Sequence, residues 1–133
     1  MNRSITKVIL SLVVIFLLSY SNKTFSSVLP GDDAYAAVAE SMPEPVGGLP
    51  QIYKKISYPV MAVKAGVQGK VYIMAFINEN GDVDEAKVIK GIGMGCDEEA
   101  VRAVKDSKFK PASNKGQSIK AKSTLAIVFK INN

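Results

Sequence analysis

Three glycines alternate with other residues just before an expected helix, in the run Gly91-Ile92-Gly93-Met94-Gly95-Cys96. A glycine-rich turn between a strand and a helix is a place where a protein can bind phosphate. The dinucleotide fingerprint, however, needs glycine at the position of Cys96, and a Walker A loop needs Gly-Lys-Ser/Thr where Cys-Asp-Glu follows here. We therefore interpret the glycines as backbone turns and expect no nucleotide binding.

A second polar pattern, at Asn78, Asn80, Asp82 and Asp84, alternates like the ligands of a calcium loop. The glycine that such a loop requires would fall at Val83, and no bidentate glutamate follows at the right distance. The pattern is better explained as a polar hairpin turn. No metal site and no cofactor are therefore expected.

Cys96 is the single cysteine, and the chain has no histidine. A thiol just before a helix could be reactive. Without a histidine beside it, a buried small side chain is the favoured interpretation. No serine, threonine or carboxylate pair stands in a recognisable arrangement of nucleophile and base. The sequence therefore predicts a protein that is not an enzyme.

The first 27 residues have the features of a secretory signal peptide. Arg3 and Lys7 precede the apolar stretch Val8–Leu18, and small residues follow it. Apolar stretches of about 10–14 residues are typical of signal peptides, whereas a spanning helix needs roughly 20. We expect export with cleavage after Ser21 or near Ser26, and a short retained membrane anchor is the alternative.

Residues 28–48 are rich in proline and glycine and are interpreted as a flexible linker, with one domain at residues 49–133. Three of the seventeen basic residues precede Ser27, and none of the twelve acids does, so the remainder is close to neutral. Its six last bases, all lysines, follow Ser107 with no acid among them. These lysines suit either an acidic partner peptide or a strand edge protected from aggregation. Nucleic acid is not an expected partner.

The pattern of residues 49–133 predicts the order helix, strand, strand, helix, strand. Apolar side chains alternate on both faces of Lys70–Ile77, which is typical of a central strand. Asn80-Gly81 is a strong hairpin signal before the returning, more polar strand. The expected elements are a short helix from Pro50 to Ile56, a further helical turn from Pro59 to Gly66, strands Lys70–Ile77 and Val83–Lys90, a helix Asp97–Ser107 and a strand Ile119–Ile131.

Charged residues support the longer helix. Asp97 is expected to cap its first turn, and Glu98 lies four residues before Arg102, a spacing that favours an ion pair. The fold class expected from these elements is α+β.

Several short motifs occur in an order and spacing that point to a known family: Tyr58-Pro59, Ala62, Ala65, Gly66–Val71, Phe76–Val83, Val88–Gly91, Asp97–Val101 and Lys108–Ala112. Together they resemble the TonB C-terminal domain over roughly Tyr58 to Asn133. The resemblance implies two short helices packed on a three-stranded antiparallel sheet. It also implies a periplasmic protein of Gram-negative bacteria that serves energy-coupled transport across the outer membrane.

The resemblance further implies a binding site. TonB-dependent outer-membrane receptors present an extended segment, the Ton box, which adds to a sheet edge of this domain. Carried over, that edge is the last strand, near the segment at Ser57, Tyr58 and Pro59. The candidate peptide-binding residues are Ser57, Tyr58, Pro59, Lys122, Thr124, Ala126, Val128 and Lys130.

Two alternatives stay open. The exposed last strand could pair with a second copy or with another envelope protein, giving an assembly module without a transport role. If the N-terminus is retained in the inner membrane, motor proteins there could be partners. Full transducers have a membrane helix with a polar motif and a long proline-rich stalk, and this chain departs from both.

Overall fold

The computed structural model describes residues 34–132, so the predicted signal segment 1–27 lies outside the described residues. Three helices are present in the described part: α2 (Leu49–Tyr53), α3 (Val60–Lys64) and α4 (Cys96–Lys105). The strands are β1 (Glu44–Pro45), β2 (Gly69–Ile77), β3 (Val83–Lys90), β4 (Phe109–Lys110), β5 (Ala112–Asn114), β6 (Gln117–Ile119) and β7 (Ala121–Phe129).

The central sheet has three antiparallel strands in the order β3-β2-β7. The Asn80-Gly81 hairpin predicted between β2 and β3 is present, and the Asn78 N–H donates to the Asp82 carbonyl across it. β2 is the central strand, as its apolar faces predicted. The α+β class and the three-stranded antiparallel sheet are therefore confirmed.

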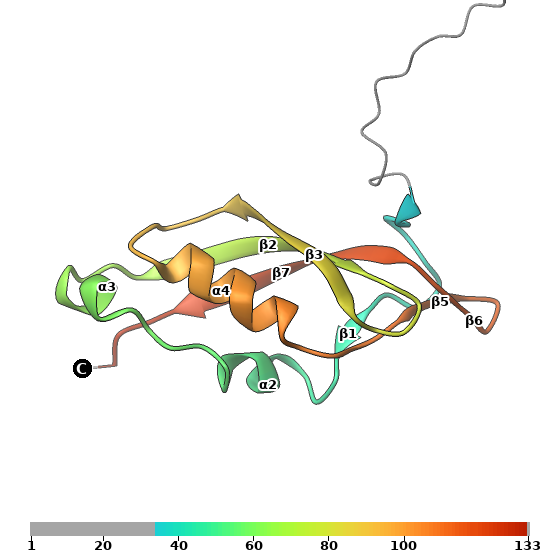
Figure 1. Ribbon diagram of the computed structural model, residues 1–133, viewed down its shortest axis with the longest axis horizontal. Coiled ribbons are helices and arrows are strands. Elements are labelled where there is room, and N and C mark those ends of the chain that lie inside the picture. The colour runs from blue at the N-terminus through green and yellow to red at the C-terminus, as the bar shows by residue number, and fades with distance from the viewer. Residues whose placement is uncertain (1–33, 133) are drawn as a thin grey trace, which may run out of the picture.

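The hydrophobic core lies between this sheet and α4, which crosses in front of the strands in Figure 1. Alternate residues of β2 point into the core because side chains along a strand alternate between its two faces. α4 contributes Ala100, Ala103 and Val104 from one side of the helix. The core side chains from β2 and β7 are Val71, Ile73, Ala75, Ile77, Leu125, Ile127 and Phe129.

The helical segment before β2 is divided in two. α2 ends at Tyr53, and Pro59 then acts as the N-cap of α3 with extended backbone angles. A residue before proline is pushed out of the helical region, so Tyr58-Pro59 separates the two helices. α4 starts at Cys96 behind Gly95, one residue earlier than expected, and Asp97 is not its cap.

Gly81 fixes how the β2–β3 hairpin meets the segment after α4. Its φ of +82° lies in the left-handed region, and an added Cβ would stand 1.9 Å from the Phe109 carbonyl oxygen. The Phe109 N–H donates to the Gly81 carbonyl at 2.9 Å. Glycine is therefore required here by both conformation and space.

Residues 34–48, expected as part of a flexible linker, are hydrogen-bonded to the domain at several points. β1 pairs with β4, Ser41 pairs with Ser113, and Ala36 forms a parallel bridge to Ala121. These residues lack a periodic apolar pattern, and backbone groups make the pairings. We call residues 35–46 the N-terminal strap.

Candidate functional site

β7 is an edge strand of the central sheet, and its outward backbone groups can be assigned. The N–H of Lys122 donates to the Ala36 carbonyl, and the N–H of Val128 donates to the Tyr53 hydroxyl, each at 2.9 Å. Backbone groups alternate along a strand, so the N–H groups of Thr124 and Ala126 point the same way. No residue from 34 to 132 bonds to those two outward N–H groups.

The side chains of these residues lie on the sheet face opposite α4. Thr124, Val128 and the following Lys130 are exposed, whereas Lys122 and Ala126 are half-buried. This set comprises all five of the strand positions predicted to bind a peptide. The structure thus brings them together along one edge, with a lysine at each end.

Tyr58 lies at the Phe129 end of that edge. Its ring packs edge-on against Phe129 with centroids 5.3 Å apart, and its hydroxyl donates to the Val67 carbonyl at 2.5 Å. Burial, and then the neighbouring Cys96, raises the pKa of Tyr58. Tyr58 therefore stays a neutral donor that holds its segment to the end of β7.

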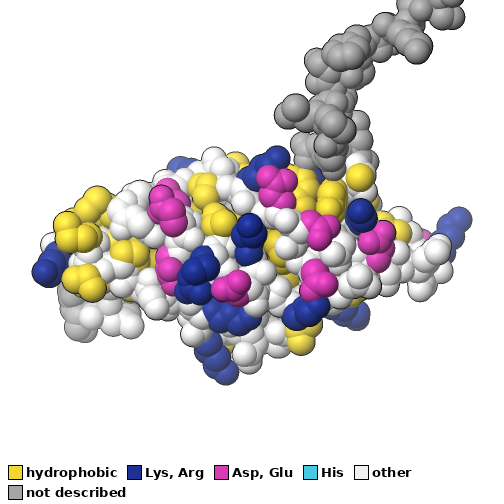
Figure 2. Space-filling view, viewed as in Figure 1, with side chains coloured by type: hydrophobic (Ala, Val, Ile, Leu, Met, Phe, Trp, Pro, Cys, Tyr) yellow, Lys and Arg dark blue, Asp and Glu magenta, His cyan; other side chains and the backbone are white. Residues whose placement is uncertain are grey.

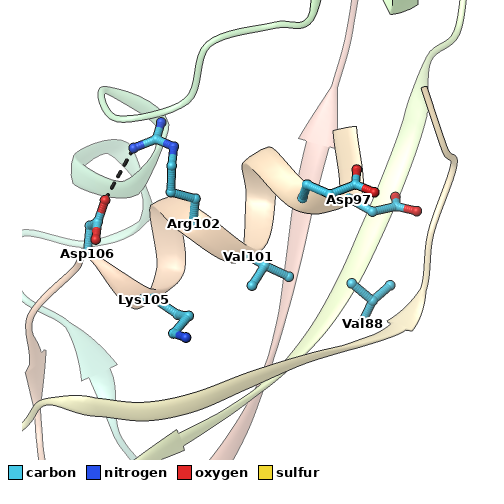
Figure 3. Close-up of a pocket in the computed structure, with 7 residues that line it drawn as sticks. Val88, Asp97, Val101, Arg102, Lys105 and Asp106 are labelled. Carbon is cyan, nitrogen blue, oxygen red and sulfur yellow. Dashed lines mark hydrogen bonds and ion pairs between the residues drawn. The ribbon is translucent and has the colours of Figure 1, made fainter. Parts of the chain in front are cut away.

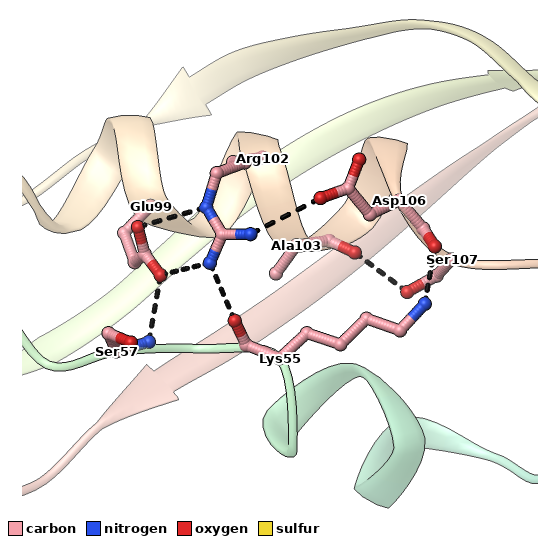
Figure 4. A network of polar contacts seen from close by, with 7 residues as sticks. All are labelled: Lys55, Ser57, Glu99, Arg102, Ala103, Asp106 and Ser107. Atoms are coloured by element: carbon pink, nitrogen blue, oxygen red, sulfur yellow. Dashed lines mark hydrogen bonds and ion pairs between the residues drawn. The ribbon is translucent and has the colours of Figure 1, made fainter.

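A polar network holds the residues before Tyr58 against α4 (Figure 4). The Ser57 N–H donates to Glu99 Oε1 at 2.8 Å, and Arg102 Nη2 donates to the Lys55 carbonyl at 2.7 Å. Arg102 also pairs with Glu99 and Asp106. The Arg102 guanidinium and then the Ser57 N–H lower the pKa of Glu99. The predicted Glu98 pairing is replaced, because Glu99 faces both Arg102 and the Ser57 backbone.

Two residues at the β7 edge were not predicted. Tyr53 was expected only as a residue of a short helix, yet its hydroxyl accepts the Val128 N–H. Ala36 was assigned to a linker, yet it pairs with Lys122. No sequence signal marks either contact, since a strand edge bonds to any group that reaches it.

Backbone amides in the glycine run before α4 are already hydrogen-bonded within the protein. The Asp97 carboxylate accepts the N–H groups of Ile92 at 2.8 Å and Gly93 at 3.2 Å. These amides would have to be free to hold a phosphate, which agrees with the interpretation of the glycines as backbone turns. Cys96 is fully buried, and this burial raises the pKa of its thiol. The expected buried small side chain is confirmed.

A groove of about 530 Å³ lies on the other side of α4, where Val101 faces Val88 of β3 (Figure 3). Three of its polar groups are already engaged: Asp97 bonds to the glycine run, and Arg102 pairs with Asp106 of the groove as well as with Glu99. Among residues 34–132, no three acidic or cysteine side chains gather to hold a metal. The described residues that line the groove therefore do not present a set of polar groups that point together at a ligand.

The helix-covered face of the molecule carries acids and bases side by side (Figure 2). Binding to a nucleic-acid phosphate backbone normally uses a positively charged surface, which this mixed face does not provide.

Hydrophobic side chains gather at the end of this face around α3, where Val60, Met61 and Val63 are exposed. Within the described part of the chain, no helix has the length and apolar character needed to cross a bilayer.

The fold is a small α+β domain, and part of one edge of its central sheet is unpaired within residues 34–132. The family model for the C-terminal domain of the Gram-negative bacterial TonB protein matches residues 54–131, so the chain belongs to this family. Domains of this family are transport-coupling domains without enzymatic activity. They are associated with the cell envelope and generally interact with outer-membrane receptors. The resemblance inferred from the motifs is confirmed.

Two solved structures are similar to this chain, both determined by NMR in solution. The TonB C-terminal domain of Pseudomonas aeruginosa is 26% identical, with a TM-score of 0.49 and coverage of 59% of this chain and 80% of the other. That of Helicobacter pylori is 26% identical, with a TM-score of 0.43 and coverage of 59% and 85%. Comparison with curated proteins gave no match.

Proposed function

We propose that the chain binds Ton-box-like segments of TonB-dependent outer-membrane receptors by strand addition to β7. The observation that carries the proposal is the pair of unbonded outward N–H groups at Thr124 and Ala126 in an edge strand. An added strand gains main-chain hydrogen bonds there, whatever its side chains. Family membership connects such binding to transport across the outer membrane.

The two edges of the sheet differ in a way that favours β7. The β2–β3 register is interrupted at two places, and β3 carries Asp84, Glu85, Lys87 and Lys90. Bulges and charges are devices that discourage strand addition. The β2–β7 register runs without interruption over all nine residues of β7. β7 is therefore the regular edge that a partner can extend.

Charge and position add to this argument. Lys122 and Lys130 stand near the two ends of the open stretch, so acidic residues in the partner would be attracted. Tyr58 packs against Phe129 at one end of that stretch, with Ser57 and Pro59 beside it in the chain, so this segment can contact the same partner. In this proposal the domain works in the periplasm, either free after cleavage or attached to the inner membrane by its N-terminus.

The test is an amide NMR titration of the full-length chain, in detergent micelles, with a synthetic Ton-box peptide. The amides of Thr124 and Ala126 should shift most, and a scrambled peptide should leave them unchanged. Ala126→Pro removes one outward donor and should weaken binding about tenfold or more, whereas Ala126→Val keeps the donor and should bind. Saturable shifts confined to other parts of the chain would contradict the proposal.

The same free edge also favours a second candidate, pairing of β7 with another copy in an envelope assembly. Sedimentation of the full-length chain over a range of concentrations separates the two. Self-association that Ala126→Pro abolishes, together with no response to the peptide, would support assembly over receptor binding.

A further inference from the structure

The N-terminal strap already uses part of the edge assigned above to a partner. Ala36 donates its N–H to the Lys120 carbonyl and accepts the Lys122 N–H, both at 2.9 Å. The bridge is parallel to β7, so the chain adds a short piece of its own strand to this edge. One end of the proposed binding site is therefore occupied intramolecularly.

Tyr35 extends this contact onto the open face of the sheet. Its ring meets Phe76 edge-on at 5.2 Å, and its hydroxyl donates to Asp84 Oδ2 at 2.5 Å. Lys120 lies over the Tyr35 ring at 5.6 Å. Phe76 is only 3% exposed, although it points away from the core that α4 covers. Tyr35 and Ala36 thus hold the first part of the strap to both the edge and the face of the sheet.

The positions already bonded on β7 limit the length of a partner strand that can bind without displacing Ala36 or Tyr53. The Lys122 N–H is taken by Ala36 at one end, and the Val128 N–H is taken by Tyr53 at the other. Among residues 34–132, only Thr124 and Ala126 between these two positions present outward N–H groups without a bonding partner. A partner that pairs beyond this pair of residues toward Lys122 must remove Ala36.

We propose that residues 35–37 of the strap and the partner strand are alternative occupants of the Lys122 end of the β7 edge. The inference rests on the proposed function, because it takes the partner to be a receptor segment added to β7. Binding then releases the first part of the strap, and the docked strap lowers the apparent affinity for the partner. The coupling is reciprocal, so whatever draws residues 35–37 away from β7 favours the partner.

The test compares peptide binding by the full-length chain in micelles and by three variants. Ala36→Pro removes the N–H that bonds to Lys120, and Tyr35→Ala removes the ring over Phe76. Val38→Pro is the matched control, because Val38 is 81% exposed and its N–H has no partner among residues 34–132. The probe is a synthetic Ton-box peptide of seven or more residues, titrated against each protein.

We expect the dissociation constant of the peptide to fall about tenfold in Ala36→Pro and several-fold in Tyr35→Ala, and to stay unchanged in Val38→Pro. Without peptide, hydrogen exchange at the Lys122 amide should be faster in Ala36→Pro than in the unsubstituted chain. Equal dissociation constants in all four proteins would overturn this inference and leave the proposed function standing. No binding by any of them would overturn the proposed function and this inference with it.

Discussion

Glu99 is the residue whose removal should best show how the segment before Tyr58 is held. Glu99→Ala removes the carboxylate that accepts the Ser57 N–H at 2.8 Å and that pairs with Arg102. A hydrogen bond to a charged acceptor contributes about 1.5–3 kcal/mol, and the exposure of Ser57 places this one at the low end. The ion pair between Glu99 and the exposed Arg102 adds little to the free energy of unfolding. We expect a loss of about 1.5 kcal/mol in the free energy of unfolding.

Glu99→Gln should cost less, about 0.5–1 kcal/mol, because the amide oxygen can still accept the Ser57 N–H without the charge. Glu98→Gln, on the same turn of α4, is the control and should have no measurable effect, because no residue from 34 to 132 forms a hydrogen bond or ion pair with the Glu98 carboxylate. Urea denaturation followed by circular dichroism measures the free energy of unfolding of the three variants. Urea is uncharged, so it leaves the ion pairs unscreened.

The pH dependence gives this prediction a second, independent check. The pKa of Glu99 is lowered in the folded state, so its charged form stabilises the fold above the unfolded pKa. That contribution is lost as the pH falls from the usual pKa of a glutamate through the lowered one. The gap between the unsubstituted chain and Glu99→Gln should therefore close on acidification. A gap that stays constant from pH 7 to pH 3, or an unchanged midpoint for Glu99→Ala, would refute the role given to this carboxylate.

Three further predictions follow from single contacts. Gly81→Ala should destabilise the fold by at least about 2 kcal/mol in urea denaturation, because the added Cβ meets the Phe109 carbonyl oxygen and φ is positive. Cys96 should react with a thiol reagent at least about tenfold more slowly in the native chain than in urea, because it is buried and its thiol pKa is raised. Ala126→Pro should change stability by about 1 kcal/mol or less, since its N–H faces outward, whereas Ile127→Pro breaks the β2–β7 ladder and should cost about 3 kcal/mol or more. Thermal unfolding followed by circular dichroism distinguishes the last two, and an equal loss for both would contradict the assigned direction of the backbone groups.

The parts of the fold that could be predicted are those encoded by local patterns. Alternating apolar residues identified β2, and Asn80-Gly81 identified the hairpin, because each needs only neighbouring residues to act. The polar character of β3 agrees with its place at an edge of the sheet. The candidate residues of β7 came from the family resemblance, and their alternate spacing along one strand puts them on one face of the sheet.

The parts that could not be predicted depend on contacts between residues far apart in the chain. The Glu98–Arg102 spacing was suitable, yet Arg102 pairs with Glu99, because the Lys55 carbonyl and Ser57 N–H lie on that side of α4. The strap was interpreted as a linker because proline and glycine mark it as irregular. Its hydrogen bonds go to backbone groups about 70 residues away, which no local pattern encodes.

The docked strap changes how far the domain could work from a membrane. If the N-terminal segment stays in the inner membrane, only the residues between Leu18 and Tyr35 separate it from the strap's first contact with the sheet. Even fully extended, these roughly 16 residues span at most about 60 Å. Freeing the whole strap, residues 35–46, would add about 40 Å at the same rise. Displacement of residues 35–37 by a partner strand would free about 10 Å of that length, so binding at β7 and reach from the membrane would increase together.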